Sequence, residues 1–305
     1  MSIHESITMI GVSGREWPLS GAGPSPVTMA PNSTGLYETA VETLYSDAAY
    51  GETFEGVRYP ATTMVWTAQI GADREREPLT WESMYSDFRL DLSFEEPCTF
   101  RYDSSDGTRN RKARLQSEPK PFSSLNFEGK DPRLFSFGSV VLTMKTELPF
   151  YVGKTDAWEW KYPGLAAAGG EAWFPVTLSN PATVECWKRF VLTDQARWIL
   201  PDPSFGSKKL GHSIEHRGRT TRLPLLRKGE GITVDSHPDV QTIVAENDAP
   251  VQARYTDDLL YPIPSGARQE FIVRVTDCTN PDGAEFRIEQ PRWYLQPFSR
   301  PRITL

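Results

Sequence analysis

Proline is the residue that most limits what this chain can fold into. The sequence contains 25 prolines among 305 residues, distributed from Pro18 to Pro301. A proline inside a helix removes a hydrogen bond and clashes with the preceding turn, so this density excludes a helix bundle. Aromatic residues make up 11% of the chain and include 9 tryptophans, which a disordered chain would lack. The sequence therefore predicts an all-β protein, mainly strands with one or two short helices.

Two neighbouring segments, 52–59 and 62–70, have the alternation of strands. Apolar residues stand at even spacing within them: Val57, Tyr59, Met64, Trp66 and Ala68. This period of two predicts a sheet in which both segments have one covered face. The segment 21–31, rich in Gly, Pro and Ser, is expected to form a long loop.

The best helix candidate spans 79–92. Thr80 is suited to cap its N-terminus, and Glu82 lies in the first turn. One apolar stripe follows helical spacing: Trp81, Met84, Tyr85, Phe88 and Leu92. We expect this stripe to pack against the core.

A β-hairpin is predicted over 98–116, because Asp106-Gly107 is a strong turn signal between two strand-like runs. Its second strand contains the strongest local basic cluster of the chain: Arg109, Arg111, Lys112 and Arg114. The pattern indicates an exposed hairpin arm. Solvated charge that protects a strand edge is one interpretation, and contact with an acidic partner ring is the functional alternative.

The pattern changes near Pro149, and we place a domain boundary there. This predicts domains over 1–149 and 150–290, followed by an arm over 291–305. Short strands separated by turns, one of them at 210–216, predict an antiparallel sandwich or barrel in the second domain.

The arm contains three prolines and three arginines, so it is expected to run extended over another surface. Its aromatic residues are Trp293, Tyr294 and Phe298. Tryptophan and tyrosine are enriched at protein interfaces, and the chain has more of them than one small core needs. We therefore include these three residues among the interface candidates.

Signatures of catalysis are absent from the sequence. It has no GxSxG elbow, no P-loop and no GxGxxG turn, and no paired carboxylates that sequence alone could assign to glycan hydrolysis. His212 and His216 have a spacing found in helical metal sites, but their surroundings indicate polar histidines near a turn. We predict no catalytic, cofactor or metal site.

Charge and cysteine content limit the partners. The formal net charge of −7 disfavours general nucleic-acid binding. The segment 1–17 lacks a secretory pattern and no run is long enough for membrane insertion, so neither is expected. Cys98, Cys186 and Cys278 are odd in number and far apart, which indicates buried free thiols in a reducing compartment.

Four segments together resemble the distal tail proteins of siphophages, a family of minor tail proteins, especially those of phages that infect actinobacteria. Residues 14–21, GREWPLSG, look like the opening of the ring-forming domain of that family. Residues 223–235, LPLLRKGEGITVD, and residues 261–275 are similar to parts of its galectin-like domain. Residues 291–301, PRWYLQPFSRP, resemble the aromatic, proline-rich tail of actinobacteriophage members.

The resemblance implies a structural virion protein, made in the cytoplasm of the host bacterium and located at the tail tip. It implies a ring-forming belt domain, a β-barrel or sandwich, followed by a galectin-like β-sandwich. The ring, typically a hexamer, would join the tail tube protein to the tail-tip hub and other minor tail proteins. The family has no catalytic residues to carry over.

Two further functions are weighed against this one. A carbohydrate-binding module that contacts host surface glycan is the main alternative, which the galectin-like resemblance and the tryptophans suggest, because aromatic rings can form stacking platforms for sugars. A hydrolase of cell-wall glycan is the least favoured, since it needs two carboxylates facing each other across a cleft.

Overall fold

The computed structural model describes residues 5–21, 25–71, 80–120, 131–208 and 210–298. The protein is mainly β, with 44% of its residues in strands and two helices in the described part, which confirms the predicted fold class. The chain divides into two compact units. Unit 1 contains the described residues up to Gly153 together with 294–298, and unit 2 contains residues 154–293. The chain therefore leaves unit 1, forms unit 2 and returns to unit 1.

Unit 1 is built on one antiparallel sheet with the order β2-β1-β7-β8-β9-β6-β3, in which the end strands β2 and β3 contact each other. The sheet is thus a near-closed barrel. Its strands are β1 (Ser6–Ile10), β2 (Glu16–Ser20), β3 (Val27–Met29), β6 (Thr62–Gly71), β7 (Cys98–Ser104), β8 (Gly107–Leu115), β9 (Phe137–Thr146), β10 (Tyr151–Val152) and β20 (Trp293–Tyr294). The last two pair with each other, and β10 also pairs with β8. The long loop expected over 21–31 is corrected, because β3 lies within it and pairs with β6.

Strand β6 has the predicted covered face. Met64, Trp66 and Ala68 are buried, whereas the residues between them are only partly covered. The edge of the Trp66 ring meets Phe100 of β7, with ring centroids 5.9 Å apart at 90°. The alternation of β6 is therefore explained by a core that lies on one side of the sheet.

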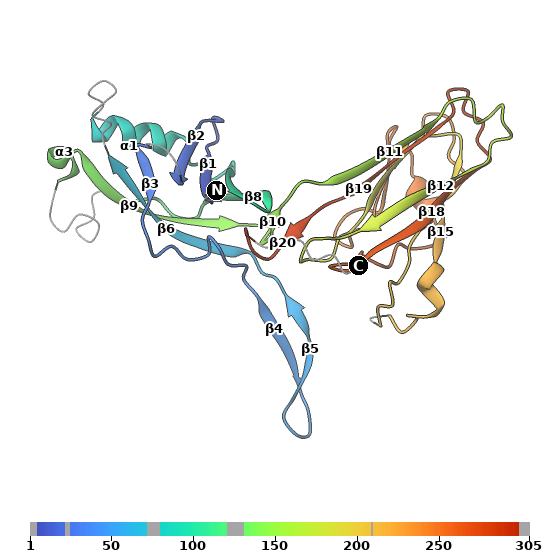
Figure 1. The fold of residues 1–305 in the computed structure, drawn as a ribbon, viewed down its shortest axis with the longest axis horizontal. Coiled ribbons are helices and arrows are strands. Elements are labelled where there is room, and N and C mark those ends of the chain that lie inside the picture. The colour runs from blue at the N-terminus through green and yellow to red at the C-terminus, as the bar shows by residue number, and fades with distance from the viewer. Residues whose placement is uncertain (1–4, 22–24, 72–79, 121–130, 209, 299–305) are drawn as a thin grey trace. The chain divides into compact units, whose positions relative to one another are not determined.

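The strand that precedes β6 along the chain, β5 (Glu52–Arg58), has no covered face. Strands β4 (Glu42–Asp47) and β5 form a separate two-stranded hairpin, which extends away from the rest of unit 1 (Figure 1). Val57 and Tyr59, which the sequence pattern assigns to a covered face, are exposed. This prediction is wrong because the only strand paired with β5 in the described chain is β4, and no second layer covers either face.

Helix α1 (Trp81–Leu90) lies within the range predicted for it, and the Thr80 side chain accepts a hydrogen bond from the Ser83 N–H. Phe88 packs edge-on against Trp17 of β2 at 5.3 Å. The indole N–H of Trp17 donates to the buried carboxylate of Asp91 at the helix C-terminus, at 2.6 Å. Strand β2 is thereby tied to α1. A second, one-turn helix, α3, spans Pro132–Phe135.

Unit 2 is an antiparallel β-sandwich. One sheet has the order β11-β19-β13-β16-β17 and the other β12-β18-β14-β15. The strands are β11 (Asp156–Tyr162), β12 (Ala172–Ser179), β13 (Arg189–Leu192), β14 (Arg197–Pro201), β15 (Thr220–Arg222), β16 (Ile232–Asp235), β17 (Ile243–Ala245), β18 (Arg268–Thr276) and β19 (Ala284–Gln290). Inward residues of both sheets, such as Trp198 and Phe286, form one core. Two short 3₁₀ helices, η1 (Glu215–Gly218) and η2 (Val251–Arg254), connect strands.

One strand prediction in unit 2 fails. Residues 210–216 form turns that lead into η1, because the local chain bonds to itself, as when the His216 N–H donates to the His212 carbonyl at 3.0 Å. Within the described residues no helix has the length and apolar character needed to cross a membrane.

The three cysteines are free and buried, as predicted. Burial raises the pKa of Cys98 to about 12 and that of Cys186 to about 11. The thiols of Cys98 and Cys186 are therefore protonated and weakly nucleophilic at neutral pH.

Candidate interaction surfaces

The basic cluster on β8 is split between the two faces of the strand. Arg109 and Arg111 are buried, Lys112 is exposed and Arg114 is partly exposed. The expectation that all four lie on an exposed arm is thus wrong for Arg109 and Arg111, because these residues are two positions apart and both lie on the inward face of β8. Arg114 donates to the Glu95 carbonyl at 2.7 Å and pairs with Glu147 at 3.2 Å.

Arg111 is surrounded by neutral oxygen atoms. Its Nη1 donates to the carbonyls of Gly35 and Glu38, at 2.8 and 3.0 Å, and to the Tyr151 hydroxyl at 2.7 Å. Gly35 has φ +73°, and a Cβ there would collide with the Thr63 carbonyl, so this turn requires glycine. Burial raises the pKa of the Tyr151 hydroxyl, which therefore stays neutral. Arg111 thus holds the segment at residues 35–38 to the sheet.

Arg109 holds the segment with which the chain returns to unit 1. Its guanidinium lies 3.6 Å from the centre of the Tyr294 ring, and Nη1 donates to the Gln296 carbonyl at 2.7 Å. Burial lowers the pKa of Arg109 from its ordinary value. The next residues are also held, because the Thr39 hydroxyl donates to the Leu295 carbonyl at 2.8 Å.

The three aromatic residues predicted on the C-terminal arm have different surroundings. Tyr294 is buried against Arg109, and Phe298 packs against Tyr37 and Tyr102 of unit 1 at 5.9 and 6.1 Å. Trp293, the first residue of β20, is the last residue of unit 2 before the boundary within that strand, and it lines a cavity of unit 2. The part of the arm at 299–305 lies outside the described residues.

The outer face of the sheet of unit 1 carries basic residues. Arg114 of β8 lies directly opposite Lys145 of β9, and Lys112 precedes it on the same face of β8. Lys112 and Lys145 are both exposed. This basic face is a surface on which an acidic segment could bind.

The β4–β5 hairpin combines exposed apolar and acidic side chains. Tyr45 and Phe54 pack against each other with ring centroids 5.8 Å apart, yet both are more than half exposed. Tyr50 at the tip is 98% exposed. Four acidic residues and one arginine lie within its strands: Glu42, Asp47, Glu52, Glu55 and Arg58. An isolated two-stranded hairpin is only marginally stable in water, and exposed apolar patches mark sites of interaction. The β4–β5 hairpin therefore has the properties of an interaction element.

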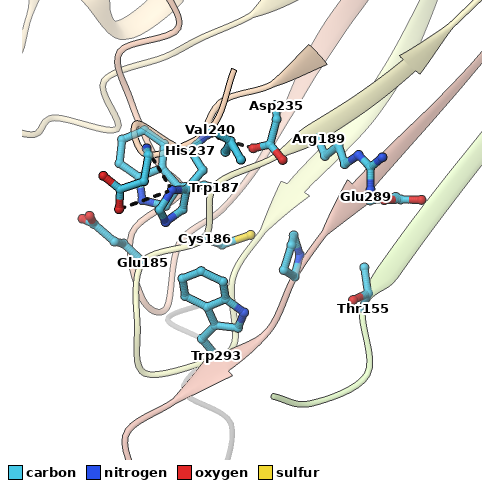
Figure 2. A pocket seen from close by; sticks show the side chains of 12 residues that line it. Thr155, Glu185, Cys186, Trp187, Arg189, Asp235, His237, Val240, Glu289 and Trp293 are labelled. Atoms are coloured by element: carbon cyan, nitrogen blue, oxygen red, sulfur yellow. Dashed lines mark hydrogen bonds and ion pairs between the residues drawn. The ribbon is translucent and has the colours of Figure 1, made fainter. Parts of the chain in front are cut away.

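Unit 2 contains a cavity of about 480 Å³. Figure 2 shows Trp187 and His237 together on one side of it, Trp293 on another, and Asp235, Arg189 and Glu289 along the rim. The His237 ring lies 6.0 Å from that of Trp187 and 5.6 Å from that of Trp293. Sequence reasoning missed this site, because its residues come from four separate chain segments.

A second surface of unit 2 is the outer face of its four-stranded sheet. Trp173 of β12, Arg274 of β18 and Ile199 of β14 lie in register across it, and Arg222 of β15 continues the row. Trp173 is 64% exposed. Four arginines line a depression at the end of this row: Arg197, Arg222, Arg227 and Arg254. The row places an exposed ring among polar side chains, an arrangement suited to sugars.

A buried ionic network also lies in unit 2, unforeseen from the sequence. The Lys188 ammonium donates to Asp202 at 3.0 Å and to the Tyr261 carbonyl at 2.7 Å, and both side chains are fully buried. Asp202 also accepts from Arg219, which reaches Asp257 at 2.6 Å. Every member has a partner within the network, so its role is structural.

The two histidines considered as metal ligands stack on each other with ring centroids 4.8 Å apart. The Nδ1 atom of His212 lies 2.9 Å from Glu215, and Nδ1 of His216 lies 2.7 Å from the Tyr261 hydroxyl. In the described part of the chain, no group of three or more His, Cys, Asp and Glu side chains is placed to hold a metal ion.

The near-closed sheet and the antiparallel sandwich together define a Dit-like fold, the fold of phage distal tail proteins. A solved structure with this fold is that of the SPP1 Dit protein, described as a paradigm of the hub adsorption apparatus in phages that infect Gram-positive bacteria. The match covers 93% of this chain and 98% of that one, with a TM-score of 0.53 and 10% identity. A chain of the phage P2 baseplate, activated with Ca, matches 95% of this chain and 98% of its own, with a TM-score of 0.47 and 11% identity.

Neither a family model nor a curated protein matches this sequence significantly. At 10% identity, the likeness to SPP1 Dit shows a shared fold.

Proposed function

We propose that this chain is a non-enzymatic structural protein of a phage tail tip. The carrying observation is the Dit-like fold, which extends over nearly the whole chain and is shared with a protein of a phage adsorption apparatus. In this proposal unit 1 is the belt domain of a homo-oligomeric ring, a hexamer, and unit 2 is a galectin-like domain. The ring joins the tail tube to the hub and other minor tail proteins of a siphophage of the actinobacteriophage type, and the chain is located in the virion.

Two surfaces of unit 1 support self-assembly. The β4–β5 hairpin is acidic and apolar, and the outer face of β8 and β9 is basic at Lys112, Arg114 and Lys145. A ring requires a heterologous interface, in which one surface of a protomer binds a different surface of the next. Complementary charge between two such surfaces favours this arrangement over symmetric pairing, which would bring like charges together.

The test measures assembly by native mass spectrometry, with the purified chain alone and mixed with the tail-tube protein of the same phage. We expect a closed oligomer in at least one condition. Tyr45→Ser with Phe54→Ser, on the exposed hairpin, should prevent assembly without unfolding unit 1. The matched control is Trp158→Ser, an exposed aromatic residue of unit 2. A chain that stays monomeric in both conditions, or a hairpin variant that assembles normally, would refute the proposal.

Carbohydrate binding is the second candidate, supported by the row of Trp173, Arg274 and Arg222 on the open sheet face. Trp173 offers a ring on which a sugar can stack, and the arginines offer donors for its hydroxyl or acidic groups. Calorimetric titration with host cell-wall polysaccharide tests this candidate. Binding that Trp173→Ala removes would support it, and no binding at millimolar sugar would contradict it.

A further inference from the structure

The cavity of unit 2 is held open by anchored chain segments. Cys186 exchanges two backbone hydrogen bonds with Ile263, at 2.9 and 2.8 Å, and Lys188 is fixed in the buried ionic network. Trp187 lies between these two anchors. On the next segment, Ser236 donates to the Lys188 carbonyl through its N–H at 3.1 Å and through its hydroxyl at 2.7 Å. The walls therefore have little freedom to collapse, which favours a preformed site.

Three neighbouring aromatic rings form part of the wall of this cavity. His237 stands between Trp187 and Trp293 and is inclined by 65° and 58° to their planes. Both indole rings are half-buried and line the cavity. The face of an indole ring carries negative electrostatic potential and attracts cations.

The charged groups around the rings also favour the binding of a cation. Glu185, Asp235 and Asp239 line the cavity, and within the described residues no lysine or arginine forms an ion pair with any of the three. Arg189, the one arginine or lysine among the lining residues, pairs with Glu289 at 3.6 Å, and Glu289 also pairs with Arg287 at 2.9 Å. The cavity therefore has an excess of negative charge beside its aromatic wall.

We infer that this cavity binds a small ligand through an ammonium group, held against Trp187 and Trp293 with the carboxylates of Asp235 and Asp239 nearby. Cation–π attraction and opposite charge act on the same group, so a neutral molecule of the same shape binds more weakly. The inference is independent of the assembly proposed for unit 1, because all the lining residues belong to unit 2.

Two kinds of molecule carry such a group at a size suited to about 480 Å³. One is a quaternary ammonium compound such as choline, and the other is a protonated amino sugar such as glucosamine. Both share the cationic nitrogen on which the inference rests. Separate titrations with the two compounds distinguish them.

The test is calorimetric titration of the full chain with choline and with glucosamine. Each is compared with a neutral counterpart, 3,3-dimethylbutan-1-ol for choline and N-acetylglucosamine for glucosamine. We expect at least one cationic compound to bind with a millimolar or lower Kd, and its neutral counterpart about tenfold more weakly. Binding of choline alone identifies a quaternary ammonium site, and binding of glucosamine alone identifies an amino-sugar site.

Variants locate the binding. Trp187→Ala and Asp239→Asn should each weaken it, Trp187→Ala by about tenfold. Asp239 is exposed at the rim, so Asp239→Asn leaves the fold intact and keeps the test valid if Trp187→Ala unfolds. The matched controls are Trp173→Ala and Asp282→Asn, exposed residues of unit 2 outside the cavity.

Three outcomes would overturn the inference. The first is no binding of either cation at about 50 mM, a concentration above the expected millimolar Kd. The second is equal binding of the neutral counterparts. The third is unchanged binding in both single variants, Asp239→Asn and Trp187→Ala. None of these results bears on assembly, so the failure of this inference and the failure of the proposed tail-tip function are separable.

Discussion

Unit 1 buries Arg111 among neutral oxygen atoms, whereas unit 2 buries Lys188 against the carboxylate of Asp202. Both cations are almost fully removed from solvent. The partners of Arg111 are two backbone carbonyls and a tyrosine hydroxyl, which stay neutral if the arginine is lost. The partner of Lys188 is the charged Asp202 carboxylate. Removal of Lys188 leaves that negative charge less compensated. The comparison teaches that the cost of removing a buried cation depends on the charge of the groups left behind.

The largest effect is expected for Lys188→Met. The substitution keeps an apolar side chain of similar length but leaves the buried Asp202 carboxylate with Arg219 as its remaining cation. We expect the free energy of unfolding to fall by about 3–5 kcal/mol. Urea denaturation, with hydrogen exchange of the unit 2 amides, measures this. The double variant Lys188→Met with Asp202→Asn should recover part of the loss, and no recovery would contradict the charge argument.

Arg111→Met is expected to cost less, about 2–3 kcal/mol, because it removes charged hydrogen bonds without leaving a charge behind. The loss should appear in unit 1, where residues 35–38 lose their tie to the sheet. Hydrogen exchange should show faster exchange in that segment and unchanged exchange in unit 2. A loss of unfolding free energy larger than that of Lys188→Met would contradict the comparison between neutral and charged partners.

Tyr294→Leu tests the second buried arginine of unit 1. Leucine retains an apolar side chain over Arg109 but has no ring face for the guanidinium. We expect a loss of about 1–2 kcal/mol, the range of a desolvated cation–π contact. The double variant Arg109→Met with Tyr294→Leu measures the coupling, and additive losses would show that the two side chains do not interact.

The smallest effect is expected for Lys112→Ala, on the opposite face of the same strand. Lys112 is exposed, so the free energy of unfolding should change by less than about 0.5 kcal/mol. Thermal denaturation followed by circular dichroism is sufficient to measure it. A change comparable to that of Arg111→Met would mean that the two faces of β8 are not as different as their burial indicates.

The pattern of the sequence predicted local elements well where one face is covered. The stripe from Trp81 to Phe88 predicted α1, and Met64, Trp66 and Ala68 predicted the inward face of β6. The same alternation at Val57 was misleading, because period two reports a strand and cannot report whether a second layer covers it. Strand β4 was missed for a related reason, since its exposed residues mix acidic and apolar types with no covered face.

The candidate surfaces depended on contacts between distant segments, which the sequence alone does not reveal. Arg109 and Arg111 looked like surface charge because arginine is rarely buried, and their partners Tyr294 and Gly35 lie far away along the chain. The residues of the unit 2 cavity are likewise spread from Thr155 to Trp293. The interface role of the basic cluster on β8 remains a prediction, and Lys112 and Arg114 are now the best candidates for it.

The return of the chain to unit 1 has a consequence for synthesis on the ribosome. Arg109 is made before any residue of unit 2, but Tyr294 and the Gln296 carbonyl, which cover it, are made after the whole of unit 2. During translation the Arg109 side chain of unit 1 therefore stays uncovered until unit 2 has been synthesised, while unit 2 can already fold. A nascent chain that stops within unit 2 carries this uncovered arginine, which distinguishes it from a finished protein.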